Sequence, residues 1–308
     1  MLKTAVAFGN METCLVSGTE EDRSPASVPE PSIPDGFAVA LGAGGARGLA
    51  HIVLIEALDD LGIKPVAIAG SSMGAFIGAA WAAGMSGRDI RLHALSMLRN
   101  RGEALARVMR ARVGRLSDLF GGQLGNPALL DAEILLDLFW PDAVPDRFEQ
   151  LSIPFLSVAT DYFGRKETVF ESGPLGPAVA ASIAIPGLLK PVETAGAFLI
   201  DGGVLTPLPW LHLAGRAGAV IACDVTGGPA PGEANAPSPI EAIFGSSQIM
   251  QGALVQNQLR DSQPDLLLRP AVDRFRALDF FRIAQILEAA EPTRDEIKRG
   301  VEKLIAAA

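Results

Sequence analysis

The chain has 308 residues, of which 49% are hydrophobic and 20% charged, a composition typical of a globular protein and not of a disordered one. The formal net charge of -9 argues against nucleic acid as the main partner, because that affinity comes from Lys and Arg side chains that neutralise phosphates. The two cysteines, Cys14 and Cys223, have the spacing of neither a metal site nor a disulfide framework, which fits a reducing compartment.

The first 34 residues contain a Ser/Thr/Glu/Pro-rich stretch that cannot bury enough apolar surface to fold, so we expect a flexible tail over 1–34. The start lacks the long apolar run of a secretory signal, and no stretch of about 20 uncharged apolar residues follows. We therefore expect a cytoplasmic protein whose contact with membranes is at most peripheral, at the inner membrane surface.

The first elements after the tail predict a parallel βαβ unit. A short apolar run at 37–41 stops at glycines and is followed by a helical apolar pattern over 49–61, which Gly62 ends. A second apolar run at 66–69 leads into an almost wholly apolar helix over 75–83. Two strands around a crossover helix pair in parallel.

The rest of the chain continues the alternation of strands and helices. Further apolar runs predict strands at 155–159, 168–170, 198–200, 219–223 and 266–268. We predict an α/β fold over 35–308, a three-layer α/β/α domain with a central, mostly parallel sheet and covering helices in 271–308. The Pro/Gly-rich stretch 227–239 is expected to be a surface loop.

Residues 70–74 have the pattern Gly-x-Ser-x-Gly, in which a sharp strand-to-helix turn exposes the central serine, Ser72. Composition alone produces this pattern fairly often, but here it follows a predicted strand and opens a predicted helix. Ser72 is therefore the candidate nucleophile, and the N–H of Met73 is a candidate oxyanion donor. The alternative is a glycine turn with no catalytic role.

Residues 42–48, Gly-Ala-Gly-Gly-Ala-Arg-Gly, lie between the first strand and the first helix, where free N–H groups favour negative charge. Such a loop can stabilise an oxyanion beside the serine, since ligands of open α/β sheets bind at the carboxyl ends of the strands. Nucleotide binding is the rival interpretation, but a dinucleotide fingerprint needs Gly where Arg47 stands, and the Gly-Lys-Ser/Thr of a P-loop is absent.

Asp201 ends the predicted strand 198–200 and is followed by two glycines, which leave its backbone unobstructed. At a strand end beside the crevice, its carboxylate could accept the serine proton; the alternative is a loop aspartate that caps a turn. Asp161 and Asp224 also end strands, but neither is followed by two glycines, and we interpret both as structural.

A Ser-His-Asp triad would need a histidine after the aspartate in an ordinary α/β-hydrolase, and only His212 has that position. It lies in a predicted helix eleven residues after Asp201, so we interpret it as a helix residue without a catalytic role. His51 and His93 are likewise interpreted as helical.

Segment 88–115 carries eight arginines against two acidic residues, a local charge of +6 within an acidic chain. Its apolar residues form one helical stripe, so the segment could lay an amphipathic helix on an anionic lipid surface. The alternative is a covering helix with a solvated charged face.

Together these motifs resemble the patatin-like phospholipases, especially the small bacterial members related to the catalytic domain of neuropathy target esterase. The resemblance spans about residues 37–270 and rests on four motifs in order, at 42–48, 70–74, 181–187 and 201–203. It implies that Asp201 pairs with Ser72 without a histidine and that Gly44, Gly45, Ala46 and Arg47 occupy the oxyanion loop. Ala43 departs from the more common triple glycine.

We accordingly expect a serine acyl hydrolase that cleaves lipid esters by two-step acyl transfer, with Arg47 ordering the loop or contacting a phosphate. The resemblance implies phospholipids, lysophospholipids or simple acyl esters as substrates, with no calcium, other metal or cofactor required. The alternatives are an acyltransferase and a catalytically silent regulatory protein of the same fold. The sequence leaves the oligomeric state open.

Overall fold

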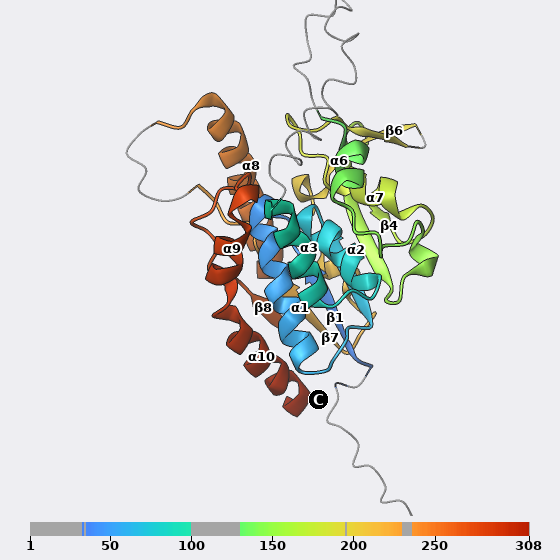
Figure 1. Cartoon of the computed structure of the whole chain (residues 1–308), viewed down its shortest axis with the longest axis vertical. Coiled ribbons are helices and arrows are strands. Elements are labelled where there is room, and N and C mark those ends of the chain that lie inside the picture. Colours follow the sequence, from blue (N-terminus) through green and yellow to red (C-terminus); the bar gives the residue numbers. More distant parts are fainter. Residues whose placement is uncertain (1–32, 34, 100–129, 195, 230–235, 308) are drawn as a thin grey trace, which may run out of the picture. The chain divides into compact units, whose positions relative to one another are not determined.

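The computed structural model describes residues 33, 35–99, 130–194, 196–229 and 236–307. The predicted tail therefore lies outside the described residues, except for Ile33, which is buried in the core. The elements of the described part, shown in Figure 1, are β1 (Phe37–Leu41), η1 (Gly45–Ala50), α1 (His51–Asp60), β2 (Ala67–Ser71), α2 (Met73–Ala82), α3 (Gly87–Arg99), α6 (Ala132–Phe139), η2 (Phe148–Gln150), β3 (Phe155–Asp161), β4 (Lys166–Phe170), α7 (Leu175–Ser182), β5 (Val192–Thr194), β6 (Ala197–Asp201), η3 (Gly202–Val204), η4 (Trp210–Leu213), β7 (Ala219–Cys223), α8 (Pro239–Asp261), β8 (Leu266–Leu268), η5 (Phe280–Arg282), α9 (Ile283–Ala290) and α10 (Thr293–Ala307).

One mixed sheet forms the centre of the molecule. Over the described residues it has eight strands in the order β5-β6-β3-β2-β1-β7-β8, with β4 also paired to β3. The pairs from β3 to β8 are parallel, as predicted, whereas β4, β5 and β6 form an antiparallel part at one end. Strand β5 was not predicted, because its three residues include an exposed glutamate and form no apolar run.

Helices cover both faces of this sheet, which confirms the predicted α/β fold with three layers. Alternate strand residues such as Val39, Leu41 and Ile68 belong to a large buried cluster with α1, α2, α7, α9 and α10. Figure 1 shows α1, α2 and α3 in front of the strands. The opposite face carries alanines from β1 and β2 and packs against Trp210 of η4 and Val255 of α8.

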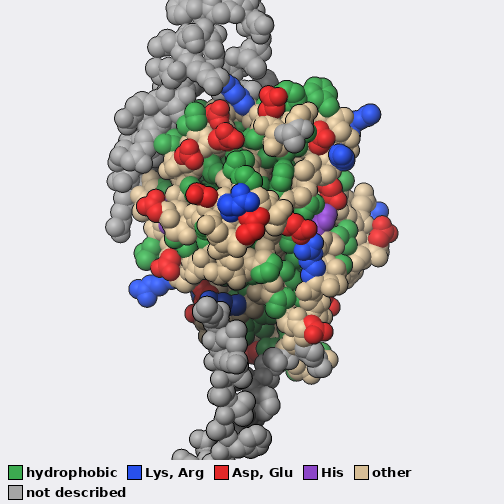
Figure 2. Space-filling view, turned by 90° about the vertical axis from the view of Figure 1, so that its right-hand side faces the viewer, with side chains coloured by type: hydrophobic (Ala, Val, Ile, Leu, Met, Phe, Trp, Pro, Cys, Tyr) green, Lys and Arg blue, Asp and Glu red, His purple; other side chains and the backbone are tan. Residues whose placement is uncertain are grey.

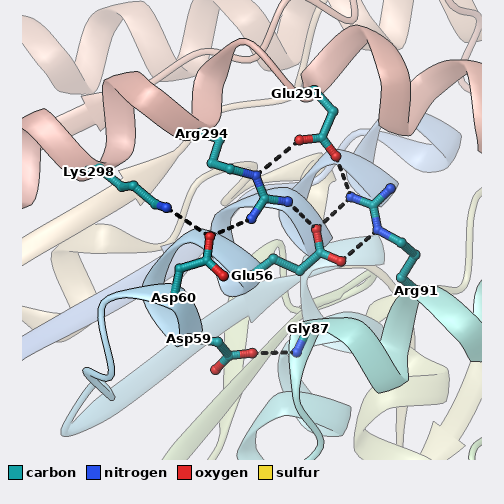
Figure 3. Close-up of polar contacts among 8 residues, drawn as sticks. All are labelled: Glu56, Asp59, Asp60, Gly87, Arg91, Glu291, Arg294 and Lys298. Atoms are coloured by element: carbon teal, nitrogen blue, oxygen red, sulfur yellow. Dashed lines mark hydrogen bonds and ion pairs between the residues drawn. The ribbon is translucent and has the colours of Figure 1, made fainter.

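An ion-pair network connects α1, α3 and α10, which cover the same face of the sheet (Figure 3). The carboxylate of Glu56 on α1 accepts hydrogen bonds at 2.5–2.6 Å from Arg91 on α3 and from Arg294 on α10. Glu291 bridges the same two arginines, and Asp60 accepts from Arg294 and Lys298. Only 11% of the Glu56 side chain is exposed, so this network is held more rigidly than an ordinary surface pair.

The described part of the arginine-rich segment is a covering helix. In α3, Ile90 and Ala94 are buried, and Arg91 takes part in the network of Figure 3. Residues 100–115, the larger part of the proposed lipid-binding stripe, lie outside the described residues. On the face drawn in Figure 2, acidic and basic side chains of the described residues are interspersed. None of the helices that the structure describes is long and apolar enough to cross a bilayer.

Candidate active site

The register of the sheet brings the ends of two strands together. Val158 of β3 lies opposite Ser71, the last residue of β2, and the next residue, Ala159, lies opposite Asp201, the last residue of β6. Because β4 occupies the other edge of β3 over this stretch, β2 and β6 share one edge and meet end to end. Successive residues of a strand are about 3.3 Å apart, so Ser72 and Asp201 must be neighbours.

Ser72 stands at the predicted turn between β2 and α2. Its backbone has φ 54° and ψ -122°, a conformation that residues with a side chain rarely adopt. Close packing requires the two glycines of the motif: a Cβ on Gly70 would lie 2.5 Å from the carbonyl oxygen of Gly74, and a Cβ on Gly74 would lie 2.1 Å from that of Leu41. The turn therefore presents the Ser72 side chain at the carboxyl end of β2.

Ser72 and Asp201 are hydrogen-bonded to each other. The hydroxyl of Ser72 donates to Oδ2 of Asp201 at 2.6 Å, and Oδ1 accepts from the N–H of Gly203 at 2.7 Å. Burial raises the pKa of Asp201 from 3.8 to about 6, and the hydrogen bonds from Ser72 and Gly203 oppose only part of this shift. A carboxyl group with this pKa is ionised at neutral pH yet basic enough to accept a proton.

Ser182 supports this pair, although sequence reasoning gave it no role beyond membership of the motif 181–187. Its hydroxyl accepts from the N–H of Ser72 at 2.9 Å and donates to the carbonyl oxygen of Val158 at 2.6 Å. The N–H of Asp201 donates to Ala184 from the same motif. The motif therefore holds the backbone of both partners, and the available sequence signal was a single serine within the otherwise apolar run 181–187.

The glycine loop packs closely against two distant segments. A Cβ on Gly44 would lie 2.4 Å from the carbonyl oxygen of Val225, and a Cβ on Gly45, which has φ +56°, would lie 2.3 Å from that of Ala277. The N–H of Ala46 donates to Ala277 at 2.7 Å, and the N–H of Arg47 donates to Gly44 at 3.2 Å. Within the described residues, the N–H groups of Gly44 and Gly45 make no such backbone hydrogen bond.

The guanidinium of Arg47 orders this loop. It is fully buried and donates to the carbonyl oxygens of Val225 and Phe275 at 3.2 Å each, and to that of Thr226. Burial lowers the pKa of Arg47, while the charges of Asp273 and Asp224 raise it in part. With its donors committed to three carbonyls, the side chain binds the loop to two other segments, which is the first of the two roles expected for it.

The sequence profile of the patatin-like phospholipases matches residues 39–214, more than half of the chain, and includes the glycine loop, Ser72 and Asp201. The chain belongs to the patatin-like phospholipase family. The predicted family resemblance is therefore confirmed.

Relatives of this patatin-like chain include proteins from bacteria and mammals. An uncharacterized NTE family protein of Mycobacterium tuberculosis is 42% identical over 191 residues, 62% of this chain and 49% of the relative. Patatin-like phospholipase domain-containing protein 7 of Rattus norvegicus is 27% identical over 281 residues, 82% of this chain and 20% of that protein. The chain thus spans about half the length of the first curated relatives it matches. Among solved structures, VipD from Legionella pneumophila has a TM-score of 0.45 and 15% identity, covering 86% of this chain and 66% of VipD.

The histidines of the patatin-like fold make contacts away from the Ser72 hydroxyl. His212, on η4, contacts the carboxylate of Glu167 at 3.2 Å, and His93 contacts the carbonyl of Phe139. His51 is fully buried, and its Nε2 lies 2.9 Å from the carbonyl oxygen of Gly42, which can only accept. Burial lowers the pKa of His51 to about 4, so this ring is neutral and supports the start of the glycine loop.

The other strand-end aspartates also serve local structure, as predicted. Asp161 accepts from the N–H of Gly164, and Asp224 accepts from Thr226 and Arg269. The described part of the chain contains no group of three or more His, Cys, Asp or Glu side chains that could hold a metal ion.

A small cavity lies over the Ser72–Asp201 pair, with a volume of about 50 Å³. Its lining comes from the glycine loop, the serine turn, the motif 181–187, η3, α8 and residues 277–278. Ile185 and Pro186 contribute apolar surface, and Ser247, Gln248 and Gln251 of α8 contribute polar groups. Of the predicted site residues, Gly44, Gly45, Arg47, Ser72 and Asp201 border this cavity, whereas Ala46 and Met73 are not part of its lining.

Proposed function

We propose that this patatin-like chain is a serine acyl hydrolase of lipid esters, with Ser72 as nucleophile and Asp201 as its base. The observation that carries the proposal is the 2.6 Å hydrogen bond from Ser72 Oγ to a buried carboxylate whose pKa is raised to about 6. As the Ser72 oxygen attacks the ester carbonyl, Asp201 accepts the hydroxyl proton.

The N–H groups of Gly44, Gly45 and Met73 are the proposed donors to the oxyanion. Gly44 and Gly45 border the cavity beside Ser72, and the N–H of Met73 is one of the first in α2, which have no partner within the helix. We assign Ala46 and Arg47 to holding the loop, because their N–H groups are bonded to Ala277 and Gly44.

Three proton transfers complete the proposed cycle. When the tetrahedral intermediate collapses, the C–O bond to the leaving group breaks, and Asp201 returns its proton to the departing alcohol oxygen. In the second half, water attacks the acyl-Ser72 carbonyl while Asp201 accepts a proton from that water. The carboxylic acid is released, and the proton returns to Ser72.

The test is to label the intact protein with a fluorophosphonate probe and to assay a series of p-nitrophenyl esters and phospholipids. Wild type should react at Ser72 and hydrolyse esters, whereas Ser72→Ala and Asp201→Ala should each lose activity by about a thousandfold or more. A protein that neither reacts with the probe nor hydrolyses any ester would instead be the catalytically silent regulatory protein given above as an alternative.

His212→Ala is the matched control, because His212 is the histidine that a triad of ordinary chain order would use. It should keep most of the wild-type rate, since its ring contacts Glu167. Loss of activity in this variant would favour a triad. Adding an acceptor alcohol separates hydrolysis from acyl transfer, because a transferase would release the new ester and little free acid.

A further inference from the structure

Helix α8 covers the candidate active site. Phe244, Ser247, Gln248 and Gln251 line the cavity above Ser72, and Val255, one turn further along the same face, is fully buried. The cavity beneath has a volume of about 50 Å³. One water needs about 10 to 15 Å³ of such space, so the cavity has room for a few waters and is far smaller than a lipid acyl chain. A lipid substrate therefore needs this cavity to widen, and α8 is the surface helix that borders it.

The polarity of α8 departs from that of a usual covering helix, because its inner face carries three polar side chains beside the apolar Phe244 and Val255 while large apolar side chains lie on its outer face. A surface helix of a globular protein buries its apolar stripe and exposes its polar one. In α8 the polar Ser247, Gln248 and Gln251 face the cavity, whereas the outer face carries Ile243, Ile249 and Met250, which are 62%, 60% and 60% exposed.

The same helix lacks charge over most of its length. Between Glu241 and Arg260, its 18 residues include no Asp, Glu, Lys or Arg, although 20% of the whole chain is charged. Charged side chains on a solvent-facing helix are inexpensive and favour solubility, so their absence beside three large exposed apolar side chains indicates contact with an apolar phase.

We propose that the outer face of α8, formed by Ile243, Ile249 and Met250, docks onto the surface of a lipid aggregate and that docking uncovers the Ser72–Asp201 site. The proposal rests on the proposed function, in which the substrate is a lipid ester. The lipid surface buries the apolar face, and the polar inner face then meets water or substrate head groups once it leaves the cavity.

This docking surface differs from the arginine-rich segment in its dependence on charge. An uncharged face gains affinity from apolar burial alone, so binding should be as strong to neutral vesicles as to anionic ones and should not weaken in high salt. Binding through the arginines of segment 88–115 would require anionic lipid and would fall as salt is added.

The experiment compares wild type, the double variant Ile249→Ser/Met250→Ser and the control Leu92→Ser. Leu92 is also an exposed apolar residue, at 57%, but it lies on α3 on the other face of the sheet. Flotation with phosphatidylcholine vesicles, with and without phosphatidylglycerol, measures binding. Hydrolysis of a short-chain phosphatidylcholine below and above its critical micelle concentration measures the response to an aggregate, with p-nitrophenyl butyrate as the monomeric reference.

Wild type and Leu92→Ser should bind both kinds of vesicle and should hydrolyse the phospholipid faster once it aggregates. The double variant should bind vesicles about a hundredfold more weakly than wild type, about tenfold for each apolar side chain lost. The ratio of its rate on aggregated phospholipid to its rate on the monomeric ester should fall by about the same factor. Thermal unfolding of each variant, together with the separate substitution Ile243→Ser, distinguishes loss of docking from loss of folding.

Three results would overturn the proposal. The first is a folded double variant that binds vesicles as wild type does and shows the same rate increase on aggregates, and the second is binding that appears only with anionic lipid. The third is a wild type that binds no vesicles but self-associates, with the self-association absent from the double variant. Failure of the proposed function would give a different set of results from failure of the docking proposal. In that case wild type would bind vesicles through α8 but would neither hydrolyse p-nitrophenyl butyrate nor react with a fluorophosphonate at Ser72.

Discussion

Replacing Asp201 by Asn should abolish activity and at the same time stabilise the fold at neutral pH. Asparagine has nearly the shape of protonated aspartic acid. Its carbonyl oxygen can accept from the N–H of Gly203, and its amide can donate to the Ser72 oxygen, so both hydrogen bonds of the wild type have a counterpart. The substitution therefore removes a buried negative charge and little else.

The size of the gain follows from the pKa of Asp201, which is about 6 in the fold against an ordinary value of 3.8. The folded state holds the proton more tightly than the unfolded state, so the stability contributed by this carboxyl is fully present below pH 3.8 and is lost as the pH rises through 6. About two pKa units at about 1.4 kcal/mol each correspond to about 3 kcal/mol. Asn has no such loss, so its advantage over Asp should grow by about 2 to 3 kcal/mol between about pH 4 and about pH 8.

Urea unfolding of wild type and Asp201→Asn across this pH range measures that difference directly. Ser72→Ala serves as a second probe, because its hydroxyl lowers the pKa of Asp201, and its removal should make the pH-dependent loss of stability larger. A variant that is less stable than wild type at about pH 8, or a difference that does not change with pH, would refute the assignment of a buried carboxyl with a raised pKa.

Three further outcomes are expected. The value of kcat/KM on a p-nitrophenyl ester should level off above about pH 7 and fall to about one tenth of that plateau at about pH 5, because Asp201 must be ionised to act; a rate that stays flat over this range would contradict its role as base. Calorimetry should show that Gly74→Ala lowers the free energy of unfolding by about 2 kcal/mol or more, since its Cβ would meet backbone oxygen atoms. The control is Gly176→Ala in α7, where the atom nearest to the added Cβ is 3.9 Å away, and it should raise the free energy of unfolding by up to about 1 kcal/mol. Arg47→Met should cost about 3 kcal/mol or more and slow fluorophosphonate labelling of Ser72, because three buried carbonyls lose their donor and the loop loses its anchor; unchanged labelling would separate the loop from the reaction.

Much of this candidate site could be predicted from local sequence, because the residues proposed for its chemistry lie at the ends of apolar strands. The Gly-x-Ser-x-Gly pattern after a strand predicted the turn at Ser72, and the structure has that turn between β2 and α2. Asp201 likewise ends β6. Strands and glycine turns are signals that a short window of sequence contains, so they needed no knowledge of the rest of the fold.

The remaining features depend on contacts between distant segments. The sequence cannot say that β6 follows β2 along the edge of β3, which is the register that makes Ser72 and Asp201 neighbours. Nor does it distinguish the N–H groups of Gly44 and Gly45 from that of Ala46, whose hydrogen bond goes to Ala277 more than 200 residues away. The uncharged run in α8 was visible in the sequence, but only the structure relates it to the cavity.

The same register explains why a serine and an aspartate are sufficient under the proposed function. Because β2 and β6 end against adjacent residues of β3, the hydroxyl and the carboxylate lie 2.6 Å apart, and no imidazole could be inserted between them without separating the two strands. A carboxylate that contacts the nucleophile directly would be too weak a base at its ordinary pKa. Asp201 lies where β2 and β6 meet, beside the glycine loop and α8, and this position supplies the burial that raises its pKa to about 6. Strand register and burial, which both come from packing around β3, would thus together perform what a histidine provides in a triad.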